Sequence, residues 1–172
     1  MTQSESALPP ERERAVWERV RAGRTGAAPR QEPSPCPEPP GAEPIPPEKL
    51  LEWIAEACEA AALYAHLARC LPGQMRPWLA ELACDKRRHA RRLAAQYYLL
   101  TGRCARMQTE FTPEASPLEL LRRRHRAELA ASHAFLDAAA GAEQEQALLL
   151  EELGKDAARH SRMTLSLLEM AL

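Results

Sequence analysis

The sequence lacks several features that define common classes of protein. It has no C-x-x-C pair, no G-x-S-x-G motif and no glycine-rich phosphate loop. These absences argue against a zinc ribbon, a serine hydrolase and a nucleotide-binding enzyme. No run of about 18 apolar residues is present, so we expect no transmembrane helix. The formal net charge is only −1, from 23 basic and 24 acidic residues, and it provides no bulk field for binding nucleic acid or a membrane.

The cysteines and the N-terminal residues indicate a cellular compartment. The five cysteines are widely spaced and odd in number, which disfavours a disulfide framework and is typical of reduced thiols. The N-terminal residues MTQSESALPPERER lack a basic region followed by an apolar run, so they do not resemble a secretory signal. We therefore expect a cytoplasmic protein.

Proline is concentrated at the start of the chain. Residues 1–47 contain 11 of the 15 prolines, which predicts a Pro-rich flexible linker over residues 23–47. Residues 1–22 include the amphipathic stretch ERERAVWERVRA, which predicts a short N-terminal helix with Trp17 on its apolar side. A helix of this length is marginal alone, so we expect it to dock on the rest of the chain or on a partner.

The apolar pattern of residues 48–172 is helical throughout, which predicts an all-α domain. The expected helices cover about residues 47–70, 74–101, 116–140 and 142–170. The inward stripe of the second helix is expected to contain Trp78, Leu82, Lys86, His89, Leu93 and Leu100. The connections are short, long and short in turn, which is typical of a four-helix bundle with one long crossover.

One signature, L-x-x-D-x-x-R-H-x-R, occurs twice with an offset of 71 residues. Its two copies consist of Leu82, Asp85, Arg88, His89 and Arg91, and of Leu153, Asp156, Arg159, His160 and Arg162. A fixed offset between helical segments indicates one helical hairpin used twice. It places His89 and His160 in equivalent positions, and these residues are the first candidates for a functional site.

Two segments, Asp85–Gly102 and Ala127–Phe135, resemble the second and third helices of the rubrerythrin-type di-iron carboxylate family. The resemblance covers about residues 48–172 and implies a ferritin-like four-helix bundle with one long crossover. It also implies an ancestry in iron-dependent redox or peroxide chemistry. The family binds two iron ions with one glutamate from each of two helices and a Glu-x-x-His motif from each of the other two.

When the family's ligand pattern is carried onto this sequence, three of its six residues remain: Glu128, His89 and His160. The other three positions hold residues that are not iron ligands, namely Ala57, Lys86 and Ala157. Three of the four carboxylates are therefore missing. Because those carboxylates neutralise and bridge the two ions, we expect no normal di-iron centre and no cofactor.

The remaining acid and the new lysine lie on inward helical stripes. An unpaired buried charge costs several kcal/mol, so we expect Lys86 and Glu128 to form a core ion pair flanked by His89 and His160. Tyr64 matches a position where the family often has a tyrosine near the metal ions, so the resemblance implies a hydrogen bond to Glu128; packing in the core without that bond is the alternative.

A shifted metal site is the alternative interpretation. Each missing acid has an acid one residue earlier, and Asp85 and Asp156 each precede a histidine by four residues, on the same helical face. A single Zn, Mn or Fe ion could then be held by Asp85, His89, Glu128, Asp156 and His160. This alternative includes residual iron-dependent oxidoreductase or peroxide-handling activity.

The sequence also contains two basic runs. They consist of Arg87, Arg88, Arg91 and Arg92, and of Arg122, Arg123, Arg124 and Arg126. Without interleaved aromatic residues they are typical of solvated helical faces, and we expect no nucleic-acid binding and no membrane binding. The sequence therefore favours a non-catalytic structural or interaction module. Its expected partners are a second copy, as a homodimer, or another protein bound through the N-terminal helix.

Overall fold

The computed structural model describes residue 18, residues 44–107 and residues 111–172. The chain divides into two units, Met1–Glu38 and Pro39–Leu172. Apart from Glu18, which is helical, the predicted N-terminal helix lies outside the described residues, and so does most of the predicted Pro-rich linker.

The described residues form four α-helices and one 3₁₀ turn, with no strand among them, so the all-α prediction is confirmed. These elements are α2 (Pro47–Cys70), η1 (Gly73–Met75), α3 (Arg76–Thr101), α4 (Pro117–Ala139) and α5 (Gln144–Ala171). Two predicted starts need a correction of two residues. Helix α3 starts later than expected because the 3₁₀ turn precedes it, and α5 starts at Gln144.

Local sequence explains two of the helix boundaries. Ser116 is the N-cap of α4, since its side chain accepts a hydrogen bond from the backbone N–H of Glu119, and Pro117 follows in the first turn. Gly102 ends α3 in the left-handed conformation, with a φ of 67°, and its N–H donates to the carbonyl of Tyr98 at 2.8 Å. Both signals are visible in the sequence.

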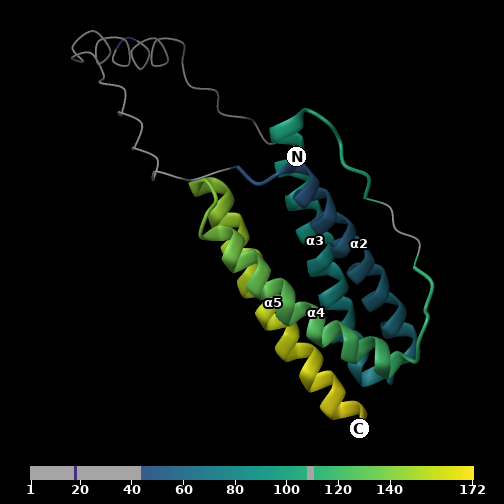
Figure 1. Ribbon diagram of the computed structural model, residues 1–172. Coiled ribbons are helices and arrows are strands. Elements are labelled where there is room, and N and C mark those ends of the chain that lie inside the picture. The colour runs from purple at the N-terminus through teal and green to yellow at the C-terminus, as the bar shows by residue number, and fades with distance from the viewer. Residues whose placement is uncertain (1–17, 19–43, 108–110) are drawn as a thin grey trace. The chain divides into compact units, whose positions relative to one another are not determined.

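Two helical hairpins make up the described domain. Helices α2 and α3 pack side by side in opposite directions, and so do α4 and α5 (Figure 1). Helix α4 begins at the end of the domain where α3 also begins, so these two helices run in the same direction. The connection over residues 102–116 therefore links opposite ends of the domain.

The apolar core consists of two clusters, one towards each end of the helices. The first cluster includes Tyr64, Leu67, Leu79, Leu82, Leu121 and Leu167. The second cluster includes Leu50, Trp53, Ile54, Leu93, Phe135 and Leu153. Along α3, the buried residues between Leu82 of one cluster and Leu93 of the other include the charged or polar side chains of Asp85, Lys86 and His89. The two clusters thus lie on either side of a polar layer.

The predicted inward stripe of α3 is wrong at its two ends. The exposed fractions of Trp78 and Leu100 are 43% and 40%. In the first turn of α3 the buried residue is Leu79, one position further along, and Leu100 lies in the last turn. The buried face is nevertheless continuous, because Leu79 keeps the spacing of three or four residues that relates Leu82, Lys86 and the later inward positions. Trp78 lies beside this stripe, and Leu100 lies on it in the exposed last turn.

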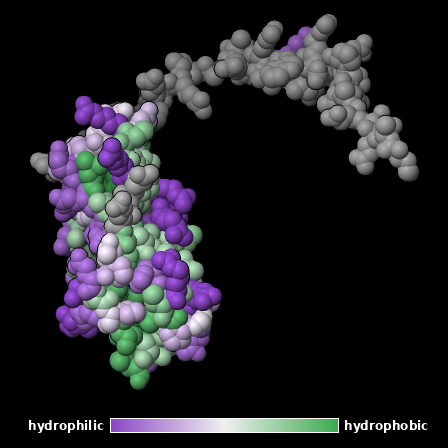
Figure 2. Space-filling model, turned by 90° about the vertical axis from the view of Figure 1, so that its right-hand side faces the viewer, coloured by the Kyte–Doolittle hydropathy of each residue, from purple (hydrophilic) through white to green (hydrophobic). Residues whose placement is uncertain are grey.

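The surface is mixed in character. In Figure 2, hydrophilic residues are interspersed with hydrophobic ones over most of the face, and hydrophobic residues gather at its lower tip. Met170 and Leu172, near the end of the chain, are among the exposed large hydrophobic residues. In the described part of the chain, no helix combines the length and the apolar character that a membrane crossing requires.

Candidate functional site

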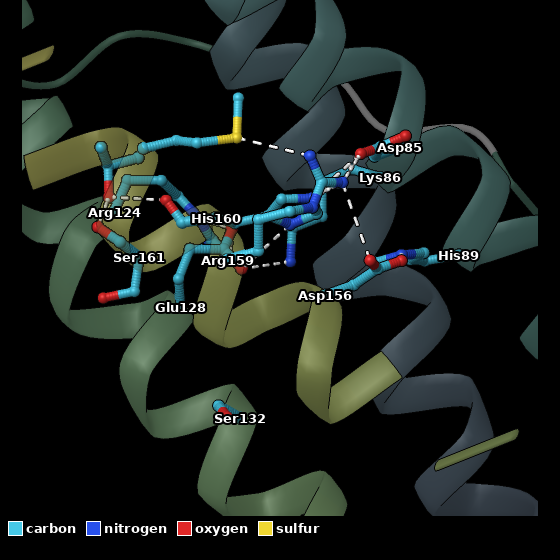
Figure 3. Close-up of polar contacts among 12 residues, drawn as sticks. Asp85, Lys86, His89, Arg124, Glu128, Ser132, Asp156, Arg159, His160 and Ser161 are labelled. Atoms are coloured by element: carbon cyan, nitrogen blue, oxygen red, sulfur yellow. Dashed lines mark hydrogen bonds and ion pairs between the residues drawn. The ribbon is translucent and has the colours of Figure 1, made fainter. Parts of the chain in front are cut away.

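A layer of buried polar side chains separates the two apolar clusters. Figure 3 shows the polar contacts within this layer. It contains Lys86 and His89 from α3, Arg124 and Glu128 from α4, and His160 from α5. Residues three or four positions apart share one face of a helix, so α3 and α4 each present two of these side chains to the centre.

The carboxylate of Glu128 lies at the centre of this layer and is fully buried. Its Oε2 is 2.6 Å from the Nζ of Lys86. Its Oε1 accepts hydrogen bonds from the Nε and Nη2 of Arg124, at 3.1 and 3.0 Å, and from the hydroxyl of Tyr64, at 3.0 Å. The structure thus brings together Lys86 and Glu128, the pair expected from the sequence, and places Tyr64 in contact with the same carboxylate.

Burial by itself raises the pKa of a carboxyl group and lowers that of an amine. The pKa of Glu128 nevertheless lies well below its ordinary value, because the contacts with His160, Lys86 and Arg124 outweigh burial. Burial lowers the pKa of Lys86, and the attraction of Glu128 opposes that shift. Removal of either charge would leave the other buried without its closest partner.

The prediction that the second basic run is solvated is wrong for Arg124. The arginines from 122 to 126 are expected to be solvated, and Arg122 does pair with Glu119 on the exposed face. Arg124 instead is only 8% exposed and donates to Glu128, which lies four residues later on the same face of α4. The signal that could have identified it is this spacing, because an inward glutamate attracts a cation one turn away.

Two Asp–His pairs cross between α3 and α5. Asp85 of α3 lies 3.1 Å from the Nε2 of His160, and Asp156 of α5 lies 2.9 Å from the Nε2 of His89. The four residues come from equivalent positions in the two copies of the repeated signature, so the two pairs are reciprocal. The alternative metal interpretation groups each aspartate with the histidine of its own helix, whereas the structure pairs each with the histidine of the other helix.

Two arginines of the same signature join the aspartates. Arg88 lies 3.0 Å from the Oδ1 of Asp85 and 3.6 Å from the Oδ2 of Asp156. Arg159 contacts Asp85 and lies 3.7 Å from the Oδ1 of Asp156. Burial raises the pKa of each aspartate, but hydrogen bonds from the histidines and the nearby arginines produce a net lowering. The sequence predicts a solvated position for Arg88 and no role for Arg159, and it misses the contacts of both with the aspartates. Their equivalent places in the repeat are the signal that could have identified them.

The two histidine rings face each other, with centroids 5.4 Å apart and an interplanar angle of 25°. The Nδ1 of His160 lies 3.7 Å from the Oε2 of Glu128, which is too far for a hydrogen bond, and it has no hydrogen-bond partner among the described residues. His89, His160 and Glu128, the three positions that match the family's ligand pattern, therefore lie close together.

These residues do not fit a di-iron centre. Glu128 already contacts two cations, and Ala57 and Ala157 supply no oxygen where the family has glutamate. Asp85 and Asp156 already pair with arginines and histidines. Within residues 44–107 and 111–172, no group of three or more His, Cys, Asp or Glu side chains is arranged to hold a metal ion.

The lowered pKa of the buried His89 predicts how the free energy of unfolding depends on pH. Burial, together with the charge of Lys86 and the ring of His160, lowers the pKa of His89 from its ordinary value of 6.5 to about 4, against the raising effect of Asp156. The unfolded chain therefore binds this proton first as the pH falls. The contribution of neutral His89 to the free energy of unfolding is complete above pH 6.5 and is lost between pH 6.5 and about 4. We expect the free energy of unfolding to fall by about 2–3 kcal/mol over this range. Urea denaturation over a series of pH values measures it.

The control for this pH effect is a second histidine. His89→Asn should flatten the dependence between pH 6.5 and about 4.5, whereas His133→Asn, at an exposed position, should leave it unchanged. The lowered pKa values of Asp85 and Asp156 act in the same direction at lower pH, so the comparison is made above about pH 4.5. An equal slope in the two variants would contradict the prediction.

Comparisons of the chain with protein-family models, with curated proteins and with solved structures find no match.

Proposed function

We infer that this chain contains a ferritin-like bundle in which side-chain cations occupy the place of the metal ions, and that it acts as a non-catalytic structural or interaction module. The observation that carries this proposal is the Lys86–Glu128 ion pair, with 2.6 Å between Nζ and Oε2, fixed at the centre of the polar layer. Lysine stands at a position where the family pattern has a glutamate ligand.

The arrangement of the helices supports the ferritin-like part of the proposal. Two antiparallel hairpins are joined by a long connection, as the resemblance implies. The three remnant ligand positions, His89, Glu128 and His160, also come from three different helices and lie in one layer. This convergence of three positions that match the family's ligand pattern supports the proposed ancestry.

Electrostatics supports the non-metal part of the proposal. In the di-iron family, carboxylates surround the metal ions and neutralise their charge. Here the single remaining glutamate is neutralised by the ammonium of Lys86 and the guanidinium of Arg124. A divalent cation entering the layer would meet two buried positive charges and would have to displace Lys86 from Glu128. The layer therefore stabilises the bundle and offers no redox-active group.

Metal binding tests the proposal directly. We expect less than about 0.1 metal ion per chain, by mass spectrometry, after anaerobic loading with Fe(II), Mn(II) or Zn(II) and desalting, because the buried cations repel added metal. The result should be the same for His89→Ala and His160→Ala.

Two other outcomes would contradict the proposal. About one ion per chain, lost in His89→Ala or His160→Ala, would establish the shifted mononuclear site with Asp85 and Asp156 as ligands. About two ions per chain would mean that other carboxylates replace the missing ones, and oxidase and peroxidase assays would follow.

A further inference from the structure

A cavity of about 460 Å³ lies between α2 and α4, beside the residues that precede α4. Apolar groups line part of it, namely Leu63 of α2, Leu120 of α4 and the ring of Phe111. Charged groups line the rest, including Glu59, Glu114 and Arg124. Its volume falls in the range of about 300–1,000 Å³ that is typical of small-molecule sites.

Arg124 connects this cavity to the polar layer. Its side chain is 9% exposed, and its Nε and Nη2 donate to Glu128, with a longer contact from Nη2 to Glu56 at 3.4 Å. The Nη1 group of Arg124 has no acceptor among residues 44–107 and 111–172, and this group is not fully buried. A guanidinium has five N–H donors, so Arg124 keeps donors free for a ligand that enters the cavity.

The other charged groups of the lining include both signs. Arg123 lies next to Arg124 in α4 and also lines the cavity; its Nε pairs with Glu119, which lies outside the lining. Glu59 and Glu114 are exposed at its wall, and neither forms an ion pair in the described part of the chain. Two arginines and two glutamates give a lining without net charge. A simple anion would be attracted by the arginines but opposed by the glutamates, and a simple amine would experience the reverse, whereas a zwitterion can pair with both.

We propose that this cavity binds a free α-amino acid with an apolar side chain. The carboxylate accepts hydrogen bonds from Arg124 and Arg123, where a planar guanidinium matches a carboxylate. The ammonium lies near Glu59 and Glu114. The apolar side chain packs on the apolar part of the lining. The proposal is independent of the metal question, because the cavity and the centre of the polar layer share only the Arg124 side chain.

The experiment is a set of isothermal titrations of the full-length protein with L-leucine and two analogues that each lack one charge. Leucinamide lacks the carboxylate, and 4-methylpentanoate lacks the ammonium. Each should bind at least about tenfold more weakly than leucine, because each leaves charged groups of the lining without a partner. Inorganic phosphate serves as the probe for a plain anion site and should bind more weakly than leucine.

The matched variants test the acidic wall without disturbing the buried arginine. Glu59→Gln with Glu114→Gln should weaken leucine binding at least about tenfold and should not weaken binding of 4-methylpentanoate. The control pair, Glu145→Gln with Glu169→Gln on α5, changes charge equally and lies outside the cavity lining. Circular dichroism and thermal melting show that each variant is folded.

Four outcomes would overturn the proposal. The first is the absence of any heat of binding for leucine up to about 10 mM, beyond which specific binding is no longer measurable. The second and third are equal binding of leucine and leucinamide, and stronger binding of phosphate than of leucine. The fourth is an equal loss of leucine binding in the cavity variant and in the α5 control variant.

Discussion

Replacement of Glu128 by glutamine is expected to lower the free energy of unfolding by about 3–5 kcal/mol, the cost typical of breaking a buried ion pair by removing one partner. The substitution keeps the shape of the side chain and removes only its charge. Lys86 and Arg124 would then be left as buried cations, 3% and 8% exposed, without the carboxylate that contacts both. Chemical denaturation at pH 7 measures the change.

Replacement of Lys86 should lower the free energy of unfolding less than replacement of Glu128. Lys86→Met leaves Glu128 with Arg124 and Tyr64 still donating to Oε1, so the carboxylate keeps most of its neutralisation. We expect a smaller loss, of about 1–3 kcal/mol, for Lys86→Met. The order of the two losses is diagnostic, because it identifies the carboxylate, and not the ammonium, as the centre of the layer.

A surface glutamate provides the control for charge removal. Glu119→Gln removes a carboxylate that pairs with Arg122 and Arg123 on the exposed side of α4, where solvent screens the charges, so its removal should change the free energy of unfolding little. A loss for Glu128→Gln no larger than that of Glu119→Gln would contradict the prediction. So would Lys86→Met with unchanged or increased stability, since the ion pair would then contribute nothing to folding.

The helices could be predicted because their signals are local. The Pro72-Gly73 pair separates the first two helices, Gly102 ends the second, and Ser116 caps the third. Each signal acts within a few residues of the helix end that it determines. The 3₁₀ turn before α3 was not predicted, because Gly73–Met75 carries no signature that separates one tight turn from the start of an α-helix.

The candidate site could be predicted only in part. Lys86 and Glu128 were identifiable, because charged residues on inward stripes need partners of opposite sign. The crossed pairs Asp85–His160 and Asp156–His89 were not, because spacing within one helix cannot give the rotation of one helix relative to another. Arg124 was missed because its neighbours in the sequence are solvated arginines.

Restoration of the missing ligands tests whether the helices have ferritin-like geometry. The substitutions Ala57→Glu, Lys86→Glu and Ala157→Glu complete the family's pattern on buried inward positions. The structure adds a fourth requirement, because Arg124 occupies Oε1 of Glu128 through two hydrogen bonds. We therefore expect the triple variant to bind less than about one iron ion per chain, and the quadruple variant with Arg124→Leu to bind about two, by mass spectrometry after anaerobic loading.

The comparison between the triple and quadruple variants separates two explanations for a missing metal centre. If only the ligands have been lost, metal binding returns once the three glutamates are present and the guanidinium is gone, and His160→Ala added to the quadruple variant abolishes it again. If the helices have shifted around Lys86 and Arg124, a well-folded quadruple variant still binds less than about 0.2 ion per chain, because ligands must lie within tenths of an ångström of their ideal positions. That result would contradict the ferritin-like proposal while leaving the Lys86–Glu128 ion pair intact in the native chain.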